Sequence, residues 1–305
     1  MTSPAIGLMP VSTADDAIDE IVSVAKRVKS SRLRHEFLQQ PHRQNGVVVP
    51  GPFSTLVKAG DLSALKLYLL LVTKASAPPW DAALPAVVWA RALGMPETKT
   101  SASTISKTWL RLEKRKLVQR TRHKRMADVT LLREDGTGTP YTSPGDVNER
   151  YFQIPIELWT TGPNPSARWY RELSLPEFAV LLIGRSLGDE FHVPFEKGPD
   201  WYGVSADTLT RGIHGLERRG LLDVERRFEK APLSPTGWKD ALHCTLQAPL
   251  GPVGRVSGRR AKKAATGSAK RQKPTVTGTK KPNKATTGKP TKPTIGKVSR
   301  RAASH

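Results

Sequence analysis

A dense group of basic side chains marks the segment QRTRHKR near the middle of the chain. It contains Arg120, Arg122, Lys124 and Arg125 and no acidic residue. Guanidinium and ammonium groups donate hydrogen bonds to phosphate oxygens and neutralise their charge, so such a group is typical of a surface that binds a polyanion. This segment is therefore the first candidate for a binding function.

The residue types needed for catalysis do not occur at the spacings that enzymes use. The sequence has no HExxH motif and only one cysteine, and its seven histidines are too scattered for the closely spaced His-x-His metal site that nicking enzymes use. The pair Gly288-Lys289 lacks the earlier glycine that a phosphate-binding loop requires. We expect no enzymatic activity, no metal and no cofactor.

The stretch that leads into the basic segment occurs twice in the chain. SASTISKTWLRLEKRKLVQR (101–120) and SADTLTRGIHGLERRGLLDV (205–224) align without a gap under a constant shift of 104 residues, from 101 to 205, and share seven identical positions. Self-similarity at one fixed shift indicates a repeated unit, and a period of about a hundred residues fits a duplicated small domain.

Both copies have the pattern of an amphipathic helix. In the first copy Ile105, Trp109 and Leu112 recur at helical spacing and are expected to face the core. Ser101 and Ser205 stand where an N-cap is expected in the two copies. The outward face then carries Ser103, Thr104, Lys107 and Arg111 in the first copy, and Asp207, Thr208, Arg211 and His214 in the second.

The same order of elements surrounds each copy. A short extended run containing a proline, a long apolar helix and a second short helix precede it, and a β-hairpin follows it. In the first half these segments are 47–53, 62–76, 84–94 and 117–132; in the second they are 152–159, 173–188, the shortened DWYGVS, and 221–228 with 243–250.

Three further segments frame the two units. Residues 1–40 are predicted to be an N-terminal arm that is helical over 13–40, with an apolar face that docks on the chain's own body or pairs with a second copy in a homodimer. Residues 134–149 are rich in Gly, Pro and Thr, as flexible linkers are. Residues 251–305 hold 16 Lys or Arg and no acid, which predicts a disordered tail and leaves +6 of the net charge of +22 for the rest.

The repeated order of elements resembles the winged-helix domain. The segment GVSADTLTRGIHGLERRGLL looks like the turn and recognition helix of such a domain, with small residues at Gly203 and Ser205 in the turn. The resemblance implies a mostly α fold with small β-hairpin wings (α+β), built as two winged-helix domains in tandem over 41–133 and 150–250. Tandem domains of this size resemble actinobacterial DNA-binding proteins and, more loosely, two-domain plasmid replication initiators. In that resemblance Leu209, Ile213 and Leu216 hold the helix to the core, and Leu221 and Leu222 begin the wing.

Composition argues against a membrane protein. No stretch approaches the roughly 18 consecutive apolar residues that a spanning helix needs, and the first residues lack the basic start and apolar middle of a signal peptide. The single Cys244 cannot form an internal disulfide, which is consistent with a reducing compartment. We expect a cytoplasmic, nucleoid-associated protein.

The leading hypothesis is a non-enzymatic protein that binds double-stranded DNA, as a transcriptional regulator or as a replication initiator of a plasmid or mobile element. The residues 223–230 carry three acids and three bases, so the first unit is expected to bind more strongly than the second. Two alternatives are an architectural DNA binder that resembles linker histones and a protein–protein assembly adaptor. The predicted DNA contacts are Ser103, Thr104, Lys107, Arg111, Arg120, Arg122, Lys124, Arg125, Thr208, Arg211, His214, Arg226 and Arg227.

Overall fold

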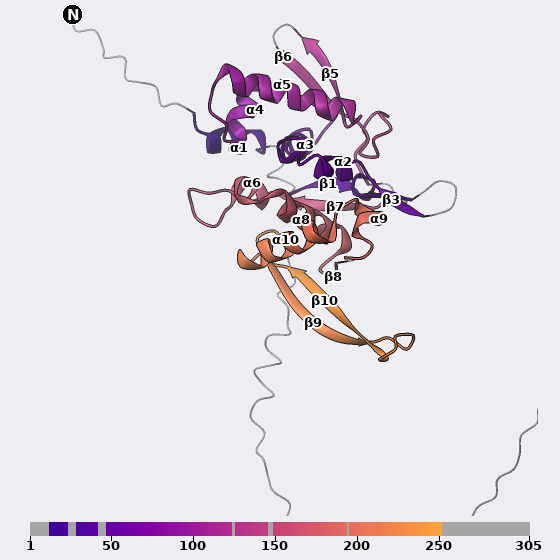
Figure 1. Cartoon of the computed structure of the whole chain (residues 1–305). Coiled ribbons are helices and arrows are strands. Elements are labelled where there is room, and N and C mark those ends of the chain that lie inside the picture. Colours follow the sequence, from indigo (N-terminus) through magenta and orange to yellow (C-terminus); the bar gives the residue numbers. More distant parts are fainter. Residues whose placement is uncertain are drawn as a thin grey trace, which may run out of the picture. The chain divides into compact units, whose positions relative to one another are not determined.

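The first of the two repeated units begins with a short helix and ends in a hairpin (Figure 1). The computed structural model describes residues 12–23, 29–41, 47–123, 126–145, 149–193 and 195–251, so the predicted tail lies outside the described residues except for Gly251. The fold is mixed α+β with small antiparallel sheets. The elements of the first unit are α2 (Phe53–Lys58), α3 (Leu62–Lys74), β4 (Asp81–Ala83), α4 (Ala86–Ala92), α5 (Lys99–Lys114), β5 (Val118–His123) and β6 (Met126–Leu131).

The second unit repeats this order. Its sheet has the strand order β8-β10-β9, which matches the order β4-β6-β5 of the first unit: in both, the last strand lies between the first two. Its elements are α6 (Glu157–Thr160), α7 (Trp169–Glu172), α8 (Leu175–Leu187), β8 (Glu190–His192), α9 (Gly198–Tyr202), α10 (Ala206–Arg218), β9 (Leu222–Lys230) and β10 (Trp238–Leu246).

The shift of 104 residues found in the sequence holds for the local structure as well. Helices α5 and α10 end at Lys114 and Arg218, and the next strands begin at Val118 and Leu222. Between helix and strand, Lys116 and Gly220 both have a positive φ, 56° and 70°. The duplication therefore includes the backbone turn that directs the chain from the third helix into the hairpin.

The two units are joined by a strand pair. β1 (Ser30–Arg34) lies antiparallel to β7 (Tyr151–Pro155), with Leu33 opposite Phe152, and both of these side chains are buried. β2 (Gln39–Pro41) pairs in turn with β3 (Val48–Pro50), and a 3-10 turn, His35–Phe37, separates β1 from β2. One continuous hydrophobic core extends through both units. The units are thus two repeats that share a core.

The predicted N-terminal helix is shorter than expected. Helix α1 spans Ala14–Ile21, and residues 30–41 form strands and a 3-10 turn, so the prediction of a helix over 13–40 is wrong for that part. The reason is tertiary: Leu33 faces inward from a strand whose partner, β7, lies far away in the sequence.

Helix α1 docks on the body of its own chain. Ile18, Ile21 and Val22 are buried, and the helix packs against α4 and α6. Arg168, just before α7, forms ion pairs with Asp15 at 3.4 Å and Asp19 at 3.3 Å. The self-docking alternative is therefore observed, and these three apolar side chains are not available for pairing with a second copy.

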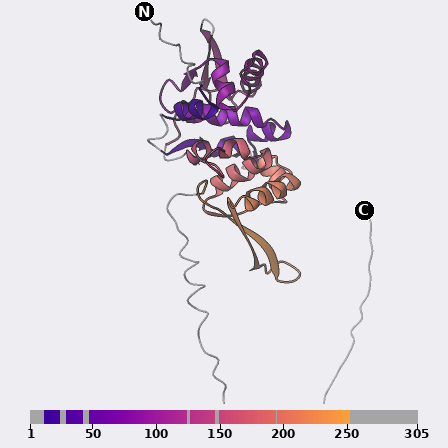
Figure 2. The ribbon, with the colours of Figure 1, turned by 90° about the vertical axis from the view of Figure 1, so that its left-hand side faces the viewer.

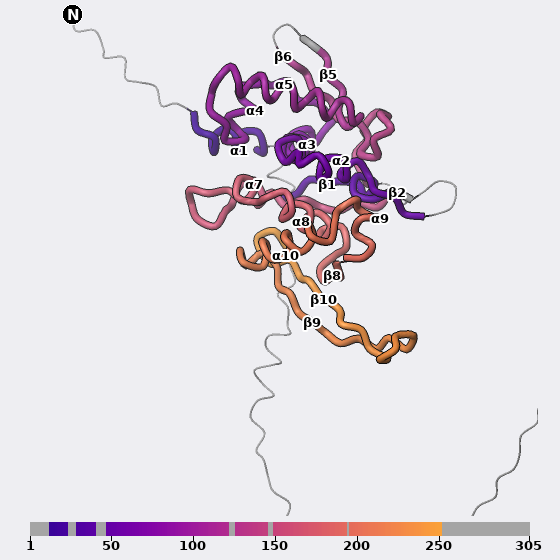
Figure 3. Tube along the Cα trace, viewed as in Figure 1, coloured from indigo at the N-terminus to yellow at the C-terminus, as the bar shows by residue number. Residues whose placement is uncertain are grey.

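A glycine lies at a tight contact between the two units, where the end of α9 packs against β3 and α2. Figure 3 shows α9 beside the strand pair that contains β2. Gly203 has a φ of 65°, as expected for the turn before α10, and a Cβ there would lie 2.5 Å from the Cβ of Ser54. We expect Gly203→Ala to lower the free energy of unfolding by about 2–4 kcal/mol, because left-handed strain adds to steric overlap.

Gly220→Ala is the matched control in urea unfolding. Gly220 has a φ of 70°, but no atom lies within 4 Å of the position that a Cβ would take. Its replacement by alanine should therefore lower the free energy of unfolding only by the left-handed strain, about 1 kcal/mol. Equal losses for the two variants would mean that the contact between Gly203 and α2 is not tight.

Candidate nucleic-acid interface

The outward face of α5 is a basic surface. Ser103 and Lys107 are exposed on it, as predicted, and Lys99 and Lys114 lie on the same face. In the described part of the chain none of these three lysines has a carboxylate within 4.0 Å. Ile105, Trp109 and Leu112 are buried on the opposite face, which confirms the predicted orientation. The periodicity of the sequence predicted which face of α5 points outward. Lys99 was not among the predicted contacts, because α5 begins earlier in the chain than predicted.

The start of α5 differs from the prediction. Thr98 is the N-cap, and its Oγ1 accepts a hydrogen bond from the Ser101 backbone N–H at 3.1 Å. Ser101 is therefore inside the helix and buried, whereas Ser205 does cap α10, accepting from the Thr208 N–H at 3.2 Å. The first unit has a longer connection between its second and third helices, and the additional residues extend α5 at its N-terminus.

Arg111 has a structural partner. Its Nε and Nη2 donate to the Asp61 carboxylate at 2.6 and 2.9 Å, and Asp61 caps α3. Burial opposes ionisation of Asp61, but the hydrogen bonds from Arg111 and Ala64 outweigh it and lower the pKa of this carboxyl. The second unit has a related contact, from Arg219 Nε to Glu177 Oε1 at 2.8 Å. These arginines fix the third helix of each unit on its first long helix.

The first hairpin is only partly described. Arg120 donates from Nε to Glu113 Oε2 at 2.8 Å, so its charge is paired within the unit. The side chain of Arg122 and all of Lys124 and Arg125 lie outside the described residues. Thr104 is half-buried and donates its hydroxyl to the Thr100 carbonyl at 2.9 Å.

The outward face of α10 is close to neutral. Arg211 is paired with Asp207 at 2.9 Å, and the Thr208 hydroxyl is bound to that of Ser205 at 2.9 Å. His214 and Arg218 are exposed beside them. The face thus presents fewer unpaired cations than that of α5.

The arginines of the second hairpin point to opposite faces of the sheet. Arg226 is exposed and lies 4.0 Å from Asp240. Arg227 donates to Glu190 at 2.5 Å and to Glu225 at 2.6 Å, and is therefore held in a network of acids. Of these two predicted contacts, only Arg226 is presented openly.

The same hairpin carries apolar side chains beyond the core. Leu222, Val224 and Leu246 pack inward near its base. Further out, Phe228, Leu233 and Trp238 are 76%, 101% and 49% exposed. Strands β9 and β10 extend away from the helices on the side opposite α5 (Figures 1 and 2). Hydrophobic side chains exposed in this way are typical of a contact surface.

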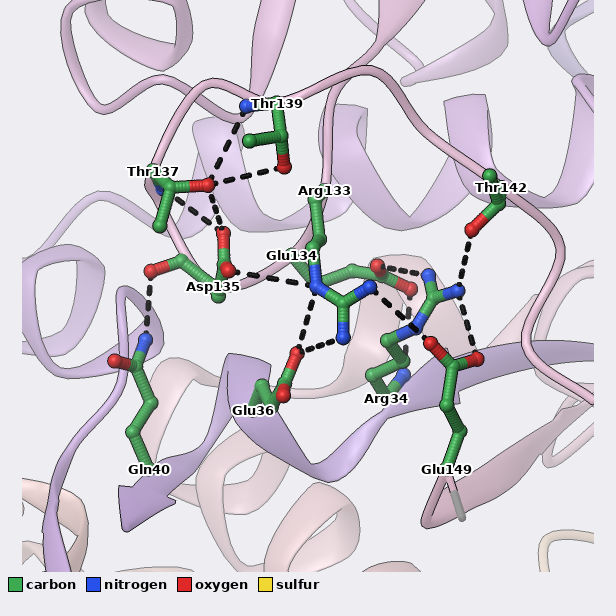
Figure 4. A network of polar contacts seen from close by, with 10 residues as sticks. All are labelled: Arg34, Glu36, Gln40, Arg133, Glu134, Asp135, Thr137, Thr139, Thr142 and Glu149. Atoms are coloured by element: carbon green, nitrogen blue, oxygen red, sulfur yellow. Dashed lines mark hydrogen bonds and ion pairs between the residues drawn. The ribbon is translucent and has the colours of Figure 1, made fainter. Parts of the chain in front are cut away.

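The segment predicted to be a flexible linker is instead held by a polar network (Figure 4). Arg34, at the end of β1, is 1% exposed and donates from Nη1 to Glu134 Oε2 at 2.7 Å. Its Nη2 donates to Thr142 and to Glu149, each at 2.9 Å. The described residues from 134 to 149 are therefore tied to the strand that joins the units, because their polar side chains find partners that are distant in the sequence.

A second arginine extends the network. Arg133 donates to Glu36 at 2.8 Å and to Glu149 at 3.1 Å. Burial alone would lower the pKa of Arg34, but the hydrogen bonds and charges of Glu149 and Glu134 raise it, so this guanidinium stays charged. Two arginines and three glutamates thus hold the connection between the two units.

His35 makes the strand pair sensitive to pH. Burial, with the charge of Arg150, lowers its pKa from 6.5 to about 4, and its ring meets that of Phe152 edge-on at 5.6 Å. Between pH 6.5 and 4 the unfolded chain binds a proton here that the folded chain does not, so stability falls as the pH falls.

We expect the free energy of unfolding to drop by about 1–2 kcal/mol more in the native chain than in His35→Gln over this range, allowing for partial exposure of the ring. Urea unfolding at several pH values measures the difference. Parallel pH profiles for the two proteins would contradict the assignment to His35.

Comparisons with known proteins give no family for this chain. No family model matches it, and neither a curated protein nor a solved structure matches it. Among the described helices, none is long and apolar enough to cross a membrane. The functional argument therefore depends on the residues themselves.

Proposed function

We propose that the protein binds double-stranded DNA through two winged-helix units in tandem, without catalysing a reaction. The order helix, strand, helix, helix and two-stranded hairpin, with the first strand at the edge of the sheet, supports this fold in both units. The observation that carries the functional proposal is the outward face of α5, where Lys99, Lys107 and Lys114 project without an acidic partner among the described residues.

A helix with this surface suits the major groove. Its lysines neutralise phosphates on the groove edges, and the exposed hydroxyl of Ser103 is able to donate to or accept from base edges. The hairpin that follows, with its basic tip, would reach the adjacent backbone or minor groove. Arg111 and Arg120 are excluded from the direct contacts because Asp61 and Glu113 engage them.

The second unit would contribute a weaker contact through His214, Arg226 and Arg211, the exposed members of the predicted set. Arg211 is kept because its pair with Asp207 is largely exposed, unlike the pairs of Arg111 and Arg120. The outward face of α10 carries charges that are paired with each other. We therefore propose that α10 contacts the DNA groove mainly by its shape and only weakly by neutralising phosphates. DNA contact by two units in tandem would suit a transcriptional regulator and a replication initiator equally. The residues do not favour one of these processes over the other.

Selection of bound sequences from random DNA duplexes tests the proposal. The full chain should enrich one sequence motif, and a chain ending at Gly251 should enrich the same motif with lower overall affinity, because the basic tail adds only sequence-independent attraction. Enrichment of no motif by either protein would contradict sequence-specific binding and favour an architectural role.

The exposed apolar hairpin favours one second candidate, an assembly adaptor that binds protein. Phe228, Leu233 and Trp238 would then form the contact, and the DNA surface of α5 would be independent of it. If the hairpin binds protein, replacing these three residues by serine should leave the affinity for DNA unchanged. A loss of DNA affinity in this variant would indicate that the hairpin contacts DNA.

A further inference from the structure

Two histidines that are far apart in the sequence meet on the second sheet. His192 on β8 pairs in register with His243 on β10, and their rings lie 4.0 Å apart between centroids. Glu229 of β9 completes the group, with Oε1 at 3.0 Å from His243 Nε2 and 3.7 Å from His192 Nε2. Sequence spacing did not indicate this meeting, because the two histidines lie on strands that pair across about fifty residues of chain.

We propose that His192, His243 and Glu229 bind a divalent transition-metal ion of the zinc class. Two imidazoles and one carboxylate are an ordinary donor set for such an ion. Bonds of about 2.0–2.1 Å in a tetrahedral arrangement require donor atoms roughly 3.3 Å apart, and the two distances to Glu229 lie on either side of this value.

The surroundings of His243 support metal binding. Its ring is nearly buried, and its Nδ1 lies 2.8 Å from Glu190 Oε1, so the tautomer that carries its proton on Nδ1 would donate to that carboxylate. A histidine that ligates a metal through one nitrogen commonly donates the other N–H to a carboxylate. In that tautomer Nε2 would direct a lone pair toward Glu229 Oε1, 3.0 Å away, and a cation bound between the two atoms would remove their repulsion.

The positive groups nearby leave the proposed ligand atoms free. Arg227 Nη1 lies 2.5 Å from Glu190 Oε1 and 3.2 Å from His243 Nδ1, on the side of the ring that faces away from Glu229. Lys239 binds the other oxygen of Glu229, Oε2, at 3.0 Å. His192 is half-exposed, so a water molecule has access to a fourth coordination position.

The consequence of metal binding would be structural. The three ligands come from the three strands of one sheet, so an ion would fasten β8 and β9 across β10 along the middle of the long hairpin. This site is separate from the proposed DNA contacts of α5, and its presence does not depend on DNA binding.

Titration of Zn²⁺ into the full chain, prepared without an affinity tag and treated with a chelator, tests the proposal. We expect one equivalent to bind and to raise the thermal midpoint. His192→Ala and Glu229→Gln should each weaken binding at least tenfold and abolish the shift, whereas His123→Ala, at the end of β5 in the first unit, should leave both unchanged. Glu190→Gln should weaken binding about 10- to 100-fold.

Failure of Zn²⁺ to bind at micromolar concentration would overturn the proposal, and the contacts of His243 with Glu190 and Glu229 would then only join the three strands. Binding that is equal in all variants would overturn it as well, because the ion would then occupy another part of the chain. The midpoint shift provides a readout even if one variant is less stable, since it compares each protein with and without the ion.

Discussion

Arg34→Met should cost about 3–5 kcal/mol of the free energy of unfolding. The substitution leaves Glu134, which is 0% exposed, as a buried carboxylate without its principal partner. Burial already raises the pKa of Glu134 and Arg34 opposes that rise, so loss of the guanidinium favours the protonated acid or the unfolded chain. Equilibrium unfolding in urea measures the loss.

Two comparisons make this prediction specific. Removing the surface pair of Arg91 with Glu97 by Arg91→Ala should cost far less than Arg34→Met, because exposed ion pairs contribute little. The double variant Arg34→Met with Glu134→Leu should lose less than the sum of the two single variants, by about 1–3 kcal/mol. A cost below 1 kcal/mol for Arg34→Met would contradict the assigned role of the network.

Simultaneous replacement of Lys99, Lys107 and Lys114 by alanine should lower DNA affinity about 100-fold at physiological salt. If each lysine neutralises one phosphate, the slope of the logarithm of affinity against the logarithm of salt concentration should fall in magnitude by about 0.9 per lysine, or roughly 2.7 in all. Fluorescence anisotropy with a labelled duplex at several salt concentrations gives both quantities.

Lys58→Ala provides the control for overall charge. Lys58 is exposed on α2, outside the face of α5, and its loss should change the slope by far less than one unit. If replacing Lys58 changed the salt slope as much as replacing one lysine of α5, the attraction to DNA would be spread over the whole surface. That result would contradict the central role of α5. Circular dichroism of the triple variant checks that α5 remains folded.

Local patterns predicted the helices and hairpins well. The long apolar helices, the third helix of each unit and the two hairpins follow from apolar spacing within one segment, as the buried face of Ile105, Trp109 and Leu112 illustrates. The strands β1, β4 and β8 were missed, because two of them span only three residues and all three acquire partners that are distant in the sequence.

The surface was harder to predict than the core. The sequence indicated which residues of α5 and α10 face outward, but it did not indicate which cations are engaged by acids. Arg111 looked free until Asp61 was found at the start of α3, and the composition of 134–149 gave no sign that Arg34 would hold it. Pairing of this kind depends on tertiary contacts, so a list of outward basic residues overestimates the binding surface.

The most direct test of the central claim is a hydroxyl-radical footprint of the full chain on a duplex obtained by selection. Two recognition helices in one protein predict two protected major-groove segments, one for each helix. The triple lysine variant of α5 should lose protection of one segment before the other. Uniform protection along the duplex, or a pattern unchanged by the lysine substitutions, would contradict DNA reading by α5.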